Sequence, residues 1–202
     1  MRARAYELLL EAWNRIKGGD FFDEQTNKHF EYMLQEVWKD HEYKNKIQTE
    51  IFNVLPHLFN QIKLHENPPP FLFILISLKD PKVNMHIQEV AISDWIKSNA
   101  SEQSTFQLLN IADTFETKGI DIKQFMHTTI KYMREGMDNE MLKAFAYMLC
   151  SKHQEYLQTI LKKFYSFTNK ALLKDFAHMI GRPAVLALMQ FLRPNEVSSI
   201  IK

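Results

Sequence analysis

Glycine and proline are scarce in this sequence of 202 residues, which contains 5 glycines and 7 prolines. An all-β fold needs turn residues at frequent intervals, so this scarcity argues against a chain built from short strands. Leucine, methionine, lysine, glutamate, glutamine and alanine, which favour helices, are plentiful instead. Hydrophobic residues make up 46% of the chain, which argues against intrinsic disorder. We therefore expect an all-α domain that buries a substantial core.

Cysteine is almost absent, and long hydrophobic runs are absent altogether. The single thiol, Cys150, cannot form an intrachain disulfide, and a lone thiol is typical of a reducing compartment. The longest apolar run, from Phe71 to Leu78, is far shorter than the roughly 20 residues of a membrane-spanning helix. Glu7 and Glu11 interrupt the amino-terminal segment, so we interpret it as an ordinary helix and not as a targeting peptide. We expect a cytoplasmic protein without a membrane span.

Apolar residues recur at helical spacing along nearly the whole chain. One stripe, from Ile47 to Ile62, keeps its phase through Pro56, which predicts a kinked helix in preference to two separate ones. Pro70 could occupy the first turn of the next helix. Although the run from Phe71 to Leu78 shows no polar face and could be a buried strand, its flanking residues favour a short buried helix.

The second half of the chain divides into helices joined by very short turns. Predicted helices lie near 101–118, 121–135, 138–150, 151–166, 168–180 and 183–192, and Pro194 opens a final short one. About twelve helices are expected in all, and short turns make successive helices pack as antiparallel hairpins. Either an irregular α-solenoid or a compact multi-helix bundle would satisfy this pattern. We expect a single domain, 1–202, with a possible subdivision at 66–70 that would separate residues 1–66 from residues 70–202.

Several residues mark the ends of these helices. Gly119 and Gly136 stand where a left-handed residue closes a helix in a Schellman motif. Helix starts are predicted at Asn84, Asp121 and Ser151, and the last two each have a glutamine three residues later, as in a capping box.

Two segments share features with a known repeat. Residues 52–62 (FNVLPHLFNQI) form a Leu-rich run with an internal proline, and a turn at Leu78-Lys79-Asp80-Pro81 precedes the apolar pair Val90-Ala91. These features resemble a HEAT repeat, whose first helix often carries a proline and whose two helices are joined by an Asp-Pro turn. The arginine customary on the second helix of that family is absent. The resemblance, which covers about residues 52–96 only, implies a scaffold that binds other macromolecules along one face and performs no chemistry.

Motifs for catalysis or cofactor binding are missing. The only glycine cluster, Gly18-Gly19, lacks the residues of a phosphate-binding loop, and neither G-x-S-x-G nor H-E-x-x-H occurs. Cys150 and His153 have a spacing that could suit a metal or a nucleophile, but Ser151 is predicted to begin a new helix between them and turn them apart. Cys150 is then a small buried hydrophobe. Asp175 and His178 share one helix face, and we interpret them as a surface pair. No catalytic, metal-binding or cofactor-binding residue is predicted, although an active site assembled from several helices stays an alternative.

Charge is spread unevenly along the chain. Residues 139–202 hold nine Lys/Arg against four Asp/Glu, whereas residues 1–68 and 69–138 are each slightly acidic. A basic segment with lysines on two helices could bind nucleic acid through phosphate contacts, which gives a second candidate function. The sequence pI of about 7.8 lies below the value above 9 typical of a dedicated nucleic-acid-binding domain.

Methionines are frequent between residues 126 and 148, where they could provide an adaptable apolar surface or fill the core. Helical hairpins offer grooves to partner helices. We therefore expect a non-catalytic adaptor or scaffold that binds a helix or peptide segment of a protein partner through an apolar groove or concave face. The candidate binding residues are Lys162, Lys163, Lys170, Lys174, Met133 and Met137.

Overall fold

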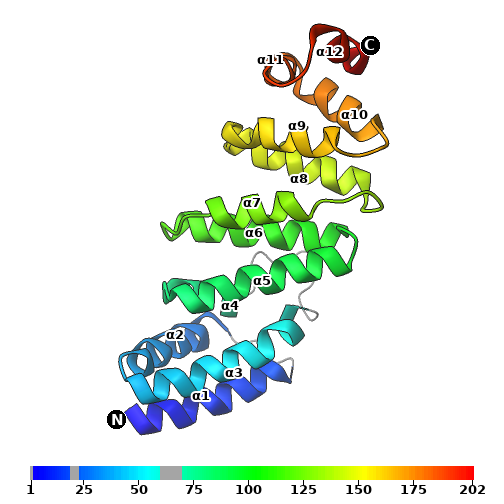
Figure 1. Cartoon of the computed structure of the whole chain (residues 1–202). Coiled ribbons are helices and arrows are strands. Elements are labelled where there is room, and N and C mark those ends of the chain that lie inside the picture. The colour runs from blue at the N-terminus through cyan, green and yellow to red at the C-terminus, as the bar shows by residue number, and fades with distance from the viewer. Residues whose placement is uncertain (1, 19–22, 60–69) are drawn as a thin grey trace. The chain divides into compact units, whose positions relative to one another are not determined.

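The computed structural model describes residues 2–18, 23–59 and 70–202 (Figure 1). Within these ranges there are twelve α-helices, one 3₁₀ turn and no strand, which confirms an all-α fold of about twelve helices. The first six helices are α1 (Arg2–Lys17), α2 (Glu24–Trp38), α3 (His41–Phe59), α4 (Pro70–Ser77), α5 (Pro81–Lys97) and α6 (Glu102–Thr117). Then follow α7 (Lys123–Tyr132), α8 (Asn139–Lys152), the 3₁₀ turn η1 (Gln154–Tyr156), α9 (Leu157–Tyr165), α10 (Ala171–Ile180), α11 (Arg182–Leu188) and α12 (Pro194–Ile201).

Two uncertain segments of the sequence prove to be helical. The apolar run that begins at Phe71 forms α4, and Pro70 is the first residue of that helix. Helix α3 continues unbroken past Pro56, so the separate helices that were the alternative are excluded; the end of that stripe, 60–62, lies outside the described residues. Across the part of the chain that the structure describes, no helix combines the length and hydrophobicity needed to cross a membrane.

The chain divides into two compact units. Unit 1 comprises Met1–Asp94 and Asn110–Asp121, and unit 2 comprises Trp95–Leu109 and Ile122–Lys202. The division therefore falls within α5 and within α6. The subdivision predicted at 66–70 falls almost entirely on residues outside the described ranges.

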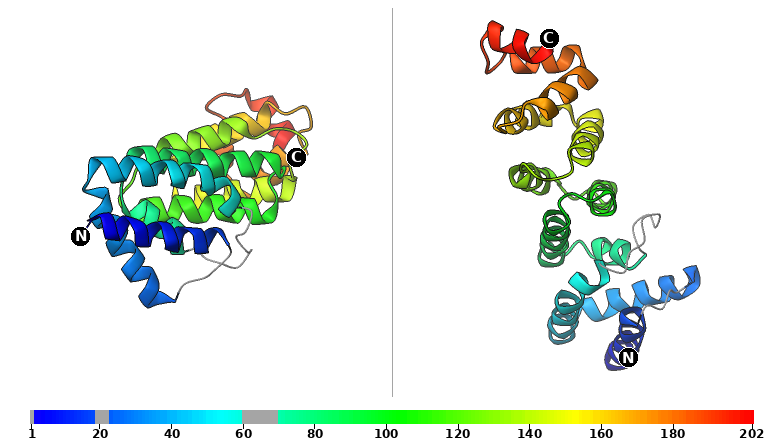
Figure 2. Two further views of the ribbon diagram at one scale, coloured as in Figure 1. Left: turned by 90° about the horizontal axis from the view of Figure 1, so that it is seen from below. Right: turned by 90° about the vertical axis from the view of Figure 1, so that its right-hand side faces the viewer.

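The amino-terminal core of unit 1 forms where α1, α2 and α3 meet (Figures 1 and 2). Leu9 and Trp13 of α1 are buried, as are Phe30 and Leu34 of α2 and Ile51 of α3. The rings of Trp13 and Phe30 are stacked with their centroids 6.4 Å apart. Each helix thus buries the apolar stripe that predicted it.

Helix α5 begins at a buried carboxylate. Asp80 is only 7% exposed, and its Oδ1 accepts hydrogen bonds from the backbone N–H of Val83 (3.2 Å) and from Gln48 Nε2 (3.4 Å). Its Oδ2 accepts a hydrogen bond from Lys44 Nζ at 2.6 Å. The helix start predicted at Asn84 is therefore wrong, because Asp80 caps the helix from four residues earlier and Asn84 is buried inside it.

Unit 2 contains a series of helices in which neighbours along the chain are neighbours in space. Each of α8 to α11 packs against the next helix, and contacts also join α7 to α9, α8 to α10, α9 to α11 and α10 to α12. Aromatic rings fill the spaces between them. Phe164 of α9 meets Phe176 of α10 edge to face at 5.4 Å, and Trp95 lies 5.6 Å from Phe145 of α8.

The predicted helix ends have mixed outcomes. Gly119 has φ of 72°, and Ile120 N donates to Phe115 O at 2.8 Å, which confirms the Schellman ending of α6. Gly136 also has positive φ, at 92°, but α7 already ends at Tyr132. Gly136 instead belongs to a separate turn, so the Schellman ending predicted there is wrong.

Neither predicted capping box begins at the residue that precedes an observed helix. The residue before α7 is Ile122, not Asp121, and the side chain of Ile122 makes no capping hydrogen bond. Ser151 lies inside α8, where the helical hydrogen bonds continue to the one from His153 N to Leu149 O (2.8 Å), and its hydroxyl donates to Met148 O. A Ser-x-x-Gln pattern alone does not start a helix when the preceding helix has no reason to stop.

Candidate binding surface

The lone thiol is unsuited to nucleophilic chemistry. Cys150 is 7% exposed, which confirms the buried position predicted for it. Burial, together with the negative charge of Glu155, raises the pKa of the Cys150 thiol to about 12. Because the thiolate is the reactive form, the thiol stays protonated and unreactive near neutral pH. We predicted that a helix start at Ser151 would turn Cys150 away from His153. The structure gives a different reason for the low reactivity expected of Cys150, which is its burial near the end of α8.

The histidines do not build a metal centre in the described ranges, where no group of three or more His, Cys, Asp or Glu side chains could hold a metal ion. The ring nitrogen Nδ1 of His153 lies 3.5 Å from Glu155 Oε1. His178, which shares its helix with Asp175, has its Nε2 2.7 Å from the carbonyl oxygen of Ile201. Its described contact is therefore with the last turn of α12.

Two of the four candidate lysines are engaged within the protein. Lys163 Nζ donates to the carbonyl oxygen of Lys131 at 2.8 Å, and burial lowers the pKa of its ammonium group. Lys170 Nζ donates to the carbonyl oxygens of Tyr165 and Phe167 at the end of α9. The ammonium groups of Lys163 and Lys170 thus satisfy carbonyl oxygens near helix ends. Each would have to break these hydrogen bonds before it could bind a phosphate.

The other two candidate lysines, Lys162 and Lys174, lie on α9 and α10. Lys162 Nζ lies 5.5 Å from the centroid of the Phe191 ring, at cation–π distance, and Lys174 is half-buried on α10. The four lysines therefore do not form one row of ammonium groups that point freely into solvent.

The two candidate methionines belong to the core. Met133 and Met137 are 1% and 4% exposed, so their assignment to an exposed binding surface is wrong. Met126 is fully buried as well, whereas Met148 on α8 is 39% exposed. Methionine spacing alone could not separate these cases, because a flexible thioether suits both a core gap and a binding surface.

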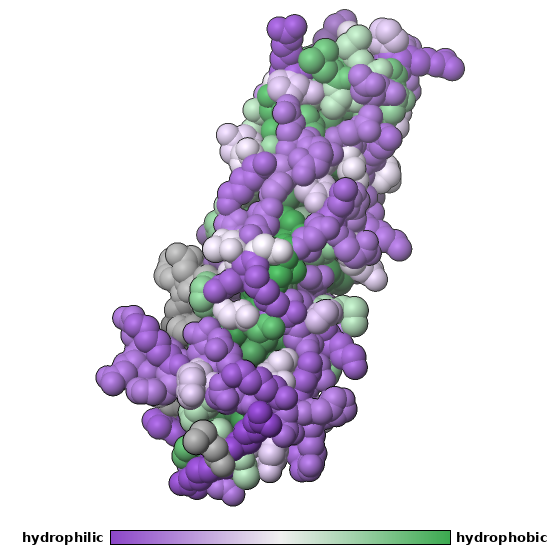
Figure 3. Space-filling model, turned by 90° about the vertical axis from the view of Figure 1, so that its left-hand side faces the viewer, coloured by the Kyte–Doolittle hydropathy of each residue, from purple (hydrophilic) through white to green (hydrophobic). Residues whose placement is uncertain are grey.

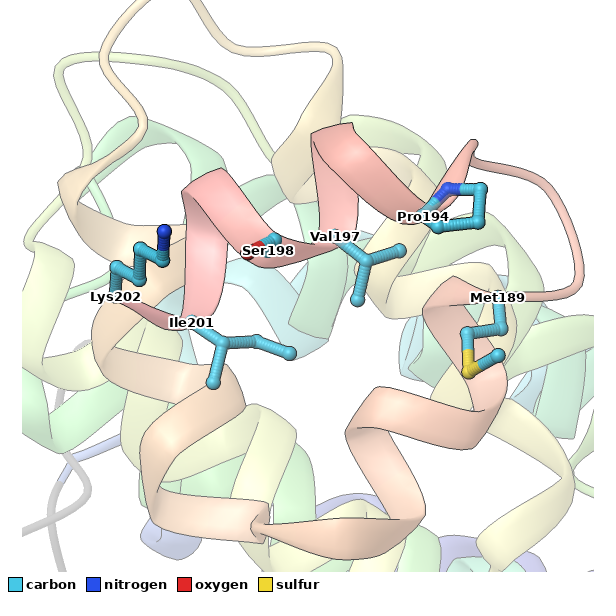
Figure 4. A pocket seen from close by; sticks show the side chains of 6 residues that line it. All are labelled: Met189, Pro194, Val197, Ser198, Ile201 and Lys202. Carbon is cyan, nitrogen blue, oxygen red and sulfur yellow. The ribbon is translucent and has the colours of Figure 1, made fainter.

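An open apolar groove with a volume of about 340 Å³ lies beside α12 (Figure 4). Val197 and Ile201, one helical turn apart on α12, direct their side chains toward the groove, and Met189 approaches from the segment after α11. The full lining consists of Met189, Pro194, Val197, Ser198, Ile201 and Lys202. Four of these six residues are apolar, and a largely apolar lining with a few polar groups is common in binding sites.

Helix α12 is held at both ends. At its start, Glu196 Oε2 accepts from Arg193 N at 2.8 Å, and Glu196 Oε1 accepts from the Tyr165 hydroxyl at 3.3 Å. The charge of Glu196 raises the pKa of that hydroxyl, and partial desolvation adds to the effect. At its end, His178 binds the carbonyl oxygen of Ile201. These contacts fix one wall of the groove, because α12 carries most of the lining.

Large apolar side chains reach the surface around this end of unit 2. Met179 on α10 is 45% exposed, Leu186 on α11 is 53% exposed and Met189 is 55% exposed. On the face shown in Figure 3, hydrophobic atoms come to the surface over the carboxyl-terminal helices, at the top of the view. Exposed side chains of this size make this end of unit 2 a candidate interaction surface.

None of the groove residues was among the predicted binding residues. One signal was available: Val197, Ile200 and Ile201 give α12 apolar residues that cannot all face the same way, because Ile200 and Ile201 are about 100° apart on a helix. Ile200 is buried and Ile201 is half-exposed in the groove.

Comparison of the chain with protein-family models, curated proteins and solved structures finds no match.

Proposed function

We propose that this protein is a non-catalytic helical adaptor or scaffold that binds a segment of a partner protein in the groove beside α12. The observation that carries the proposal is the groove itself, with an apolar floor of Val197 and Ile201 and a methionine, Met189, more than half exposed at its edge. An amphipathic helix that lays its apolar face in such a groove gains free energy from the apolar area removed from water.

The nature of Met189 supports a binding role. Its exposed fraction of 55% is large for an apolar side chain, and an unbranched thioether adapts its shape to different partners. Burial of the exposed part would contribute roughly 1 kcal/mol to binding. The fixed position of α12 adds to this, because a preformed wall loses little conformational freedom on association.

We also propose that the chain is a HEAT-like helical array. The Asp80-Pro81 turn that carries part of the resemblance joins α4 to α5, and Asp80 caps α5 from a buried position. The described part of the proline-containing run, residues 52–59, lies in α3, so α4 stands between that run and the Asp80-Pro81 turn. The succession of packed neighbours from α8 to α12 supports an array, because each repeat of such a protein contacts mainly its neighbours.

Nucleic-acid binding by the basic residues of 139–202 is the second candidate function. The excess of nine basic over four acidic residues favours it. The contacts of Lys163 and Lys170 with backbone carbonyls argue against it, since these side chains are committed within the fold.

The protein-binding and nucleic-acid-binding functions predict different results when the immobilised protein captures partners from native lysate, with and without nuclease. We expect captured proteins to survive nuclease, to be retained by Met85→Asp and to be lost with Met189→Asp. Met85 is a matched control because it is also an exposed methionine, 56% against 55%, but lies in unit 1 on α5. Loss of all captured proteins with nuclease would support the nucleic-acid function, and equal capture by both variants would contradict a role for the groove.

A further inference from the structure

We propose that His86 on α5 stabilises the proline-containing end of α3, because its side chain supplies a hydrogen bond that Pro56 cannot make. His86 and the backbone carbonyl of Phe52 form this contact, which we call the His86–Phe52 clasp. The clasp is a conformational device, since the last turns of α3 depend on α5 for a backbone hydrogen-bond partner. It lies within unit 1, so the inference is independent of the groove beside α12 and of the function proposed for that groove.

Pro56 leaves one carbonyl of α3 without its ordinary donor. The helix runs from His41 to Phe59, and Pro56 lies inside it. In an α-helix each N–H donates to the carbonyl oxygen four residues earlier, but proline has no N–H. The carbonyl oxygen of Phe52 therefore has no donor at position 56, and a proline ring crowds the carbonyl at that position as well. Because a shielded carbonyl without a donor is costly, a donor from another helix would stabilise this part of α3.

The imidazole of His86 provides such a donor. Its Nε2 lies 3.1 Å from the carbonyl oxygen of Phe52. A carbonyl oxygen can only accept, so Nε2 carries a proton and donates. The rings of His86 and Phe52 also lie with their centroids 4.5 Å apart, and the side chain of His86 is only 25% exposed. The ring contact orients the imidazole, and partial burial limits the replacement of the hydrogen bond by water.

The clasp is one of three contacts along a single face of α3. Lys44 Nζ donates to Asp80 Oδ2 at 2.6 Å, and Gln48 Nε2 donates to Asp80 Oδ1 at 3.4 Å. Residues 44, 48 and 52 are spaced by four, which places them on the same side of a helix. Since Asp80 also caps α5, these contacts fix the start of α5 beside α3 and bring His86 to the carbonyl of Phe52.

The other ring nitrogen of His86 points to a different group. Its Nδ1 lies 3.8 Å from Glu89 Oε2, and the side chain of Glu89 is 65% exposed. A neutral imidazole carries a proton on only one nitrogen, so the clasp requires the tautomer that is protonated on Nε2. Packing of the ring against Phe52 would not by itself select that tautomer, and the tautomer therefore distinguishes a hydrogen-bonding role from a packing role.

The test is a double-mutant cycle in the full chain. His86→Phe keeps an aromatic ring against Phe52 but removes the donor, whereas Pro56→Ala restores an N–H at position 56. Amide hydrogen exchange then gives the opening equilibrium of α3 in the wild type, in each single variant and in the double variant. His127→Phe is a control, because His127 Nδ1 also lies 2.8 Å from a helix carbonyl oxygen, that of Lys123, but on α7 in unit 2.

We expect His86→Phe to raise the opening constant of α3 about tenfold when Pro56 is present, since a shielded carbonyl then loses its donor. In the Pro56→Ala background the same change should raise it less than about threefold, because the restored N–H takes the place of the imidazole. His86→Gln, whose amide can donate to the same carbonyl, should also cost less than about threefold. His127→Phe should have the same effect with and without Pro56→Ala.

Nitrogen-15 NMR of the wild-type imidazole at alkaline pH, where the ring is neutral, should show the proton on Nε2. A proton on Nδ1 would overturn the clasp. Equal effects of His86→Phe in the two backgrounds would also overturn it and would assign His86 to packing alone. If His86→Phe prevents folding, the double variant decides: a folded double variant supports the clasp, and an unfolded one contradicts it.

Discussion

Two helices of this protein begin in the same way and have opposite surroundings. Both α5 and α12 have proline as their first residue, a position where the missing N–H costs nothing. The side chain of Asp80, which is buried in unit 1, accepts hydrogen bonds at the start of α5. The side chain of Glu196, which is half-buried in unit 2, accepts a hydrogen bond at the start of α12. A proline at the first helical position therefore begins a helix tied to the core in unit 1 and a helix that lines a groove in unit 2.

The largest effect on the free energy of unfolding should come from removal of the Asp80 side chain at the start of α5. Asp80→Ala deletes the cap of α5 and leaves Lys44 without its carboxylate, so we expect a loss of about 3 kcal/mol in the free energy of unfolding. Asp138→Ala is the matched control, because Asp138 caps α8 through Glu140 N and Met141 N but is exposed. Urea unfolding followed by circular dichroism should show a loss of only about 1 kcal/mol for that variant. Equal losses would mean that burial of Asp80 adds nothing to its role as a cap.

Acid should weaken the contacts of Asp80 at the start of α5 in the wild-type protein. Burial by itself would raise the pKa of Asp80, but the hydrogen bond and charge of Lys44 and the N–H groups of Val83 and Lys82 outweigh it, so the pKa is lowered overall. The folded state then binds a proton less readily than the unfolded state, and the stabilisation is complete above the unfolded pKa of about 3.9 and is lost as pH falls through the lower folded value. Thermal unfolding between pH 5 and pH 2 should show a steeper decline for wild type than for Asp80→Ala. Parallel curves would contradict a native carboxylate at this position.

A smaller and more local effect is expected at the start of α12. Glu196→Gln removes the charge that faces the α12 amino terminus and weakens the contact with the Tyr165 hydroxyl, at a cost of about 0.5 to 1 kcal/mol. Hydrogen exchange should show faster exchange of the α12 amides and unchanged protection of α3 and α5. If the loss of protection spread to α3 and α5, the effect of Glu196 would not be local.

The smallest effect on stability should come from the groove itself. Met189→Asp and Met85→Asp each replace a methionine that is more than half exposed, so each should change the free energy of unfolding by less than about 0.5 kcal/mol. Chemical denaturation of both variants checks this. A large loss for Met189→Asp alone would show that Met189 packs within the fold instead of serving a partner.

Sequence patterns predicted the helices better than their ends, and the ends better than the binding surface. The apolar stripes identified α1 to α3, and even the featureless run in α4 was assigned correctly between its prolines. Asn84 failed as a helix start because a proline at the first helical position, after Asp80, is the stronger signal. Gly136 satisfied the requirement for positive φ without ending a helix. A glycine with positive φ can end a helix or belong to a separate turn after it, and the sequence alone does not distinguish these two cases.

The groove could not be predicted because it depends on which residues the fold leaves uncovered. Met133 and Met189 are the same residue type, yet one is 1% exposed and the other 55%. Lysine spacing was equally ambiguous. Lys163 binds the carbonyl oxygen of Lys131, which lies 32 residues earlier, and only the folded chain brings the two together. Lys170 folds back on the nearby carbonyl oxygens of Tyr165 and Phe167, which apolar periodicity does not indicate.

The inertness of Cys150 gives this protein a practical property. Because burial and the charge of Glu155 raise the pKa of the Cys150 thiol to about 12, we expect this thiol to react slowly with maleimides near neutral pH. The wild-type chain should then give little background in site-specific labelling. A fluorophore or spin label attached through Met189→Cys would stand at the edge of the groove, and one attached through Met85→Cys would report on unit 1 as its reference. Occupancy of the groove could then be followed spectroscopically without first removing the native cysteine.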